Sequence, residues 1–166
     1  ASAGSPTHLA GELFKSVAGI DMVGIPFKGS GPALNAAIAG EVQVLLAPTG
    51  GIAPHINSGR LRALAVASTK RSPSFPNLPT VAEGGLAGYE YGQFSGIFAP
   101  TKTPAPVLEK LHRETVKVIN RPDVKEKFAN TGTDVEGSTP QEAVAKIKGE
   151  VTRLGKIIRD LKIRAD

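Results

Sequence analysis

A strand–helix–strand pattern in residues 22–46 constrains the fold of this chain more than any other stretch. Residues 22–27 are mostly apolar and include β-branched and aromatic side chains, as expected of a buried strand. A Lys-Gly-Ser-Gly sequence at 28–31 interrupts them, and a second apolar run follows at 42–46. The order of these segments predicts two strands joined by a short helix.

The segment between the two strands carries signals for both ends of a helix. Pro32 suits a first-turn position, where its missing N–H would have no helical partner. Residues 33–39 favour a helix, and Gly40 can end it in the left-handed conformation. A helix start at the carboxyl end of a strand presents unpaired N–H groups and a partial positive charge, which suit an anion.

A similar helix start occurs near the beginning of the chain. Ser5 is placed as an N-cap with Pro6 behind it, and the spacing of Leu9, Leu13 and Val17 predicts a helix to about residue 18. Ordinary capping explains either start by itself. If both helices follow parallel strands, however, both open at one sheet edge, and two converging starts indicate an anion site more strongly.

The remaining strand candidates favour an α/β fold with a mostly parallel sheet. Residues 61–67 (LRALAVA) form a nearly continuous apolar run, which is typical of a strand covered on both faces. A short helix is predicted at 52–57, a proline-containing loop at 68–79 and an extended segment at 89–99.

The last third of the chain predicts helices with little sheet to cover them. Helices are expected from Pro104 to about residue 120, from Pro122 to near residue 132, and over 139–163 with Thr139 as the cap. The last helix carries an apolar stripe with steps of three and four residues, formed by Val144, Ile147, Val151, Leu154, Ile158 and Leu161. This stripe requires a partner surface.

Composition excludes several classes of function. The chain has no cysteine, so disulfides, thiolate metal sites and cysteine nucleophiles are absent. The net charge is +5, but only 5% of residues are aromatic and none is Trp, so a base-stacking nucleic-acid surface is disfavoured. Basic residues gather in the last helix, where a solvated face is the simpler interpretation. The sequence shows no signal peptide and no apolar run of membrane-spanning length.

Catalytic and metal-binding patterns are weak. His8 and Glu12 lie one turn apart, but no third ligand accompanies them, which favours a surface role over a metal site. His55 and His112 lack a patterned partner, and there is no Gly-x-Ser-x-Gly elbow or phosphate-loop spacing around Lys28. We therefore predict no enzyme activity, catalytic residue, metal or cofactor.

Six blocks of the chain, taken together, resemble the solute receptors of tripartite tricarboxylate transporters, also called Bug-type receptors. They are residues 5–14 (SPTHLAGELF), 25–34 (IPFKGSGPAL), 54–66 (PHINSGRLRALAV), 78–83 (LPTVAE), 96–100 (GIFAP) and 103–107 (TPAPV).

The resemblance implies a two-lobed extracytoplasmic, periplasmic protein of the type II periplasmic-binding-protein class. Such a receptor closes around a small di- or tricarboxylate and delivers it to a membrane permease. Residues 1–95 would form the second ligand-binding lobe. Residues 96–166 would cross back and pack on a first lobe, which would lie outside this sequence or be replaced by another copy of the chain.

The resemblance also implies which loops hold the carboxylate. Carried over by position, the ligand-binding residues are Ser5, Thr7, Lys28, Gly29, Ser30, Gly31, Pro48, Thr49, Gly50 and Phe94. Many family members have Asn or Asp at the position of Pro48, which would otherwise hold a ligand amino group. Tyr is commoner at the position of Phe27, and Trp at that of Phe94. Lys28 is expected either to add charge to the site or to face solvent.

Two other classes of protein remain open at this point. A ligand-sensing domain of a transcription regulator can share this architecture, but it would need a DNA-binding helix pair that the sequence does not show. An α/β enzyme with an anionic substrate would need an acid, a base or a nucleophile in loops that offer mainly Gly, Ser, Thr and Pro.

Overall fold

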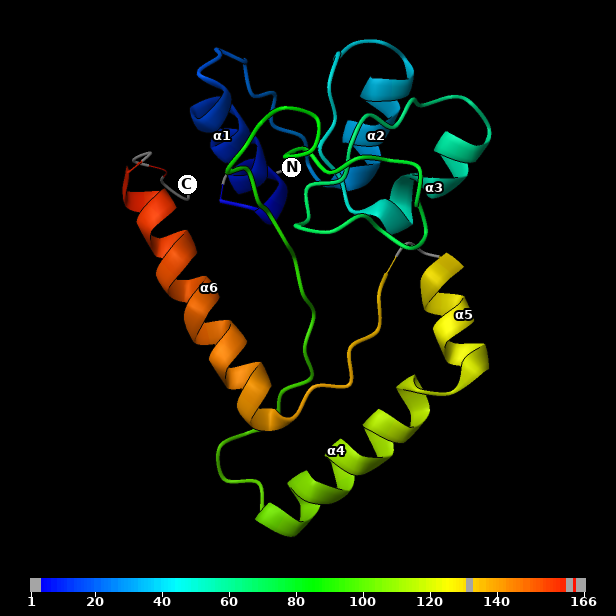
Figure 1. Cartoon of the computed structure of the whole chain (residues 1–166), viewed down its shortest axis with the longest axis vertical. Helices are drawn as coiled ribbons and strands as arrows, with labels where there is room; N and C mark the ends of the chain where they lie inside the picture. Colours follow the sequence, from blue (N-terminus) through cyan, green and yellow to red (C-terminus); the bar gives the residue numbers. More distant parts are fainter. Residues whose placement is uncertain (1–3, 131–132, 161–162, 164–166) are drawn as a thin grey trace.

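The computed structural model describes residues 4–130, 133–160 and 163, and within them the chain forms helices joined by long extended segments (Figure 1). The helices are α1 (Pro6–Ala18), α2 (Ser30–Ile38), α3 (Thr49–Asn57), α4 (Ala105–Ile119), α5 (Pro122–Asn130) and α6 (Pro140–Asp160). None of these helices has the length and hydropathy of a membrane span.

The predicted start and end of α1 are confirmed. Ser5 has extended backbone angles, and its Oγ accepts a hydrogen bond from the N–H of His8 at 3.3 Å. Pro6 occupies the first turn, where no N–H is needed. Gly19 ends the helix with φ of 62°, and its N–H donates to the carbonyl oxygen of Lys15.

Helices α2 and α3 each begin three residues before the predicted position. The first residue of α2 is Ser30, because Gly29 turns the chain sharply with φ of 105° and ψ of 178°. Such angles are essentially restricted to glycine. After α2, Gly40 has φ of 77°, in agreement with the predicted left-handed stop. Helix α3 begins at Thr49, directly after Pro48.

The C-terminal helices follow the predicted caps closely. Helix α4 begins at Ala105, one residue later than expected, and Pro104 is its N-cap. Thr139 caps α6 in a reciprocal arrangement with Glu142: its Oγ1 accepts from the N–H of Glu142 at 3.2 Å, and its own N–H donates to Oε2 of Glu142 at 2.8 Å. Residues 161 and 162 at the predicted end of α6 lie outside the described residues.

The mostly parallel sheet that we predicted is not seen in the described residues. Its one trace there is a parallel bridge between Val66 and Thr80, with the N–H of Val66 bonded to the carbonyl of Pro79 at 2.9 Å. Segments 22–27 and 44–46 have no regular secondary structure, and residues 42 and 43 bend. No backbone hydrogen bond joins the two segments within the described part, and Val23 stays 83% exposed. A residue pattern favours extended backbone, whereas a ladder requires a partner strand at the right distance.

A small core joins α1, the segment around Tyr89 and the end of α6. Its buried members are Leu9, Ala10, Tyr89 and Tyr91. The Tyr89 hydroxyl donates to the carbonyl of Ala10 at 3.2 Å, and its ring meets that of Phe14 edge to face at 5.7 Å between centroids. Partly buried side chains packed around this core are Leu13, Phe14, Val17, Leu46, Ala67, Val81, Leu86, Leu154, Ile158 and Ile163.

Residues 92–149, which we call the arm, project from this core and return to it (Figure 1). Along the predicted stripe of α6, Val144 and Val151 are 50% and 68% exposed, while Leu154 and Ile158 pack against the core. Leu161 lies outside the described residues. The predicted division into two parts at residue 95 stays a prediction. Helix α6, which follows this division in the sequence, packs against the N-terminal core.

Candidate functional site

The loop before α1 has already used most of its hydrogen-bonding groups. Ser5 Oγ accepts from His8 N, and it lies 3.4 Å from Oγ1 of Thr7. The N–H of Leu9 donates to the carbonyl of Ser5, and Pro6 has no N–H. Of the N–H groups in the first turn of α1, that of Thr7 has no partner among the described contacts and is available to a ligand.

The loop before α2 offers more donors. Gly29 makes no side-chain cap bond, since it has no side chain, and its own N–H donates to the carbonyl of Phe27 at 2.8 Å. The N–H groups of Ser30 and Gly31 have no partner among the described contacts, and Lys28, Ser30 and Gly31 are all exposed. Buried Ala33 and Ala36 anchor the helix behind them. This helix start can therefore donate two N–H bonds and a hydroxyl to an anion.

The loop before α3 is the third part of the predicted site. Pro48 is its N-cap and provides no side-chain cap bond. The N–H of Gly51 is bonded to the carbonyl of Pro48 at 3.3 Å, so it is not available to a ligand. Gly50 is exposed, and Thr49 is partly buried.

In Figure 1, α1 and α2 both begin on the side of the N-terminal region that faces the arm, and both run away from it. This common direction is what the two-start prediction requires. No described hydrogen bond joins the three loops to one another. The ten predicted ligand-binding residues accordingly remain a prediction, with the α2 start as the most open donor group.

Phe94 lies on the arm, and none of its described contacts is with the three helix starts. It is 38% exposed, and the Nζ atom of Lys146 lies 5.5 Å from the centre of its ring. This cation–π contact links Phe94 to α6.

The histidines do not form a catalytic or metal-binding group in the described residues. His8 Nε2 lies 3.9 Å from Glu12, whose carboxylate also accepts from Lys15 at 3.1 Å. His112 Nε2 lies 3.1 Å from the carbonyl oxygen of Ser138. No cluster of three potential metal ligands occurs among the described residues.

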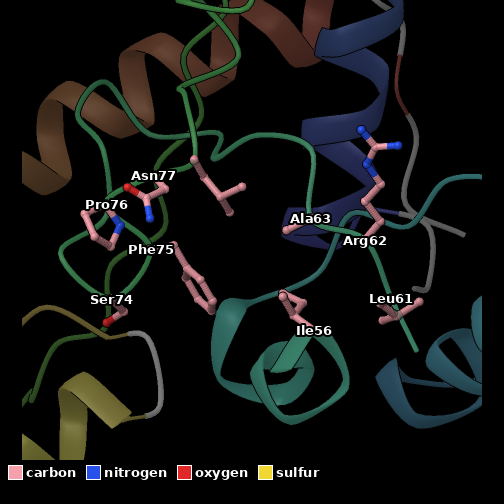
Figure 2. Close-up of a pocket in the computed structure, with 9 residues that line it drawn as sticks. Ile56, Leu61, Arg62, Ala63, Ser74, Phe75, Pro76 and Asn77 are labelled. Carbon is pink, nitrogen blue, oxygen red and sulfur yellow. The ribbon is translucent and has the colours of Figure 1, made fainter. Parts of the chain in front are cut away.

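Sequence reasoning did not anticipate an apolar pocket of about 420 Å³ beside α3 (Figure 2). Its walls include Ile56, Ala63, Phe75 and Leu78, and in Figure 2 the guanidinium of Arg62 points away from Phe75. The hydroxyl of Ser74 at its rim donates to the carbonyl of Ala129 at 2.8 Å. The prolines of the 68–79 loop were the sequence signal that could have indicated this pocket, since Pro76 lines it. An apolar pocket does not favour a carboxylate, since it would leave the charge unpaired.

The described part of the chain presents exposed backbone at the start of α2 and contains no cluster of three potential metal ligands. The sequence from residue 1 to 163 matches the tripartite tricarboxylate transporter family receptor, and the chain belongs to this family. A Pseudomonas sp. protein encoded in the tcbD-tcbE intergenic region is 35% identical over all of this chain and 50% of its own length. BugT of Bordetella pertussis is 34% identical over 95% of this chain and 48% of its own length.

Solved structures agree with this assignment. An R. palustris protein solved with adipate has a TM-score of 0.88 and 31% identity, covering 96% of this chain and 54% of the other. The periplasmic binding protein BugD has a TM-score of 0.84 and 31% identity, covering 97% and 55%. MatC from Rhodopseudomonas palustris with bound malate has a TM-score of 0.81 and 29% identity, covering 93% of this chain and 54% of the other. The fold is therefore that of periplasmic binding proteins, and the chain spans about half the length of these relatives.

Proposed function

We propose that this protein is an extracytoplasmic receptor that captures a small organic di- or tricarboxylate for a tripartite tricarboxylate transporter. The observation that carries the proposal is the family membership of residues 1–163, together with similar structures solved with adipate and malate.

In this proposal the α2 start is the main carboxylate-binding group. Its free N–H groups, at Ser30 and Gly31, belong to the end of a helix dipole and are exposed to solvent. Hydrogen bonds from N–H groups to an ionised carboxylate are roughly twice as strong as neutral ones. Ser5, Thr7, Pro48, Thr49 and Gly50 would line the same site, and Lys28 would add charge.

The proposal also requires a further polypeptide surface over the arm. The chain exposes 11611 Å². A compact monomer of 17.2 kDa would expose about 7,800 Å². The excess on this one chain, about 3,800 Å², is larger than the roughly 800 Å² that each partner buries in an interface of standard size. Exposed arm side chains such as Ile97 (84%) and Phe98 (74%) contribute to it. The covering surface would be a first lobe like that of the longer relatives, or a second copy of the chain. Sedimentation velocity distinguishes the two by mass.

Isothermal titration calorimetry of the protein expressed from its complete gene tests carboxylate capture. Adipate, malate and citrate form the panel, and NMR of the recovered ligand reports any conversion. We expect binding of at least one ligand, recovered unchanged. Heat from none of them, or a converted ligand, would overturn the proposal.

Two variants and a matched control locate the site. Ser30→Ala removes a hydroxyl at the α2 start and should weaken binding about tenfold, the value of one hydrogen bond to a charged group. Lys28→Met decides whether that lysine contributes charge. Ser16→Ala removes an exposed hydroxyl at the far end of α1 and should leave the affinity unchanged.

A further inference from the structure

The arm leaves and re-enters the N-terminal region at one place. It leaves after Tyr91, which is 9% exposed and whose N–H donates to the carbonyl of Ala67 at 2.8 Å. It returns along α6 at Glu150, just before Leu154 and Ile158 pack against the core. Figure 1 shows the departing segment and the returning helix as the two ends of one long circuit. Away from this place, the arm also contacts the N-terminal region where the hydroxyl of Ser74 donates to the carbonyl of Ala129 at 2.8 Å. A contact between the two ends holds the base of the arm.

Arg153 makes that contact. Its Nη1 donates to the backbone carbonyl of Glu90 at 3.0 Å, one residue before the arm departs. Its Nε and Nη2 donate to the two carboxylate oxygens of Glu150 at 3.3 and 2.7 Å. The side chains of Arg153 and Glu150 are 30% and 26% exposed. This pair is less solvated than the ion pair between Lys146 of the same helix and Glu136 of the preceding segment, at 45% and 68%.

The shape of the guanidinium explains why an arginine is suited to this position. Its planar fork carries several donors in fixed directions, so one side chain can hold a carboxylate on one edge and a carbonyl on another. The carboxylate of Glu150, which also lies on α6, orients the guanidinium. The backbone carbonyl of Glu90, outside α6, accepts the hydrogen bond from Nη1. The hydrogen bonds to the Glu150 carboxylate raise the pKa of the Arg153 guanidinium, which is protonated at every physiological pH.

We propose that Arg153 is a positioning residue that clasps the base of the arm and fixes the orientation of the arm relative to the N-terminal region. The inference rests on the proposed function in one respect: a receptor that binds between two parts gains affinity when the binding-competent arrangement is already populated. Loosening the clasp lowers that population and weakens carboxylate binding without touching any residue of the predicted ligand-binding loops.

Spin-label distances test the clasp directly and without ligand. The chain contains no cysteine, so labels at Ser16→Cys on α1 and Lys110→Cys on α4, both exposed, report one distance between the two parts. We expect a single narrow distribution in the otherwise unchanged protein and a broadened or displaced one after Arg153→Met. Arg153→Lys keeps a donor for the Glu90 carbonyl and should give a distance distribution narrower than that of Arg153→Met.

Two matched controls separate positioning from general effects of charge. Glu90→Gln changes the side chain but keeps the backbone carbonyl that accepts the bond, and Arg159→Met removes an exposed arginine from the same helix. Both should keep the narrow distribution. An unchanged distribution in Arg153→Met, or equal broadening in Arg159→Met, would overturn the proposal.

If circular dichroism shows that Arg153→Met does not fold, the variants Arg153→Lys and Glu150→Gln carry the same test. A distance distribution that is unchanged in both variants would overturn the proposal.

Calorimetry with adipate then connects the clasp to binding. Arg153→Met should weaken affinity about tenfold, corresponding to one hydrogen bond from a charged donor, while Glu90→Gln should not. If the unaltered protein binds no carboxylate, the proposed function fails, but the distance distributions still decide on the clasp. If it binds and Arg153→Met binds equally well, the link from clasp to affinity is wrong.

Discussion

Replacing Tyr89 by Phe should make the protein less stable at neutral pH but more stable than the unaltered protein at high pH. Tyr89 is 2% exposed, and its hydroxyl donates to the carbonyl of Ala10 at 3.2 Å. Burial, with a smaller effect from the neighbouring Tyr91, raises the pKa of the Tyr89 hydroxyl from 10.0 to about 12. The folded protein therefore disfavours the ionised form.

The sign and size of the effect follow from proton linkage. Between about pH 10 and pH 12 the unfolded chain releases the Tyr89 proton and the folded chain retains it, so stability falls as pH rises. The full loss is about 2.7 kcal/mol for two units of pKa. Tyr89→Phe loses about 1 kcal/mol at neutral pH with the hydrogen bond, but it escapes the alkaline loss. The two stability curves should cross near pH 11, by the same linkage relation.

Urea unfolding at a series of pH values measures both curves. The chain has two tyrosines and no tryptophan, so tyrosinate absorbance follows Tyr89 and Tyr91 directly in the folded protein. Ionisation of Tyr91 occurs in both proteins and cancels in their difference, apart from its smaller effect on the pKa of Tyr89. Curves that stay parallel through the alkaline range, or two tyrosines that ionise at their ordinary pKa while folded, would refute the reasoning.

Three further substitutions test local features of the structure. Ser5→Ala should cost about 1 kcal/mol in urea unfolding, because the N–H of His8 loses its cap; no loss would contradict the assigned cap. Gly29→Ala should cost about 1–3 kcal/mol and weaken carboxylate binding, since φ of 105° strains any residue with a Cβ; an unchanged midpoint and affinity would refute this. Thr139→Ala should raise the pKa of Glu142 only part of the way to its usual value, because the backbone N–H bond that lowers it most is kept and only the hydroxyl bond is lost. The lowered pKa stabilises α6 above the usual pKa of Glu142, and this contribution is lost as pH falls; an NMR titration of Glu142 that is identical in both proteins would contradict the reciprocal cap.

Local signals in the sequence predicted the helices well. Ser5, Pro6 and Gly19 fix α1 through interactions within one or two turns, and Thr139 with Glu142 does the same for α6. The start of α2 was missed by three residues because Ser30 was assigned to the interrupting turn, whereas the chain bends at Lys28 and Gly29 and the helix already includes Ser30.

Features that depend on distant contacts were not predictable in the same way. The apolar run at 61–67 predicts an extended segment, but only Val66 in it forms a bridge in the described residues. Arg153 was identified merely as one of the basic residues of the last helix. Its contact with the Glu90 carbonyl spans 63 residues and leaves no local pattern. The loops predicted to bind a ligand lie at the starts of α1, α2 and α3, and their binding role stays a prediction.

Backbone amide chemical shifts recorded during titration with a carboxylate test the central claim most directly. The account predicts that the largest shifts fall on residues before and at the starts of α1, α2 and α3, with Ser30 and Gly31 foremost because their N–H groups have no partner among the described contacts. Shifts concentrated instead around Ile56, Phe75 and Leu78 in the apolar pocket, or no shifts with any carboxylate of the panel, would contradict it.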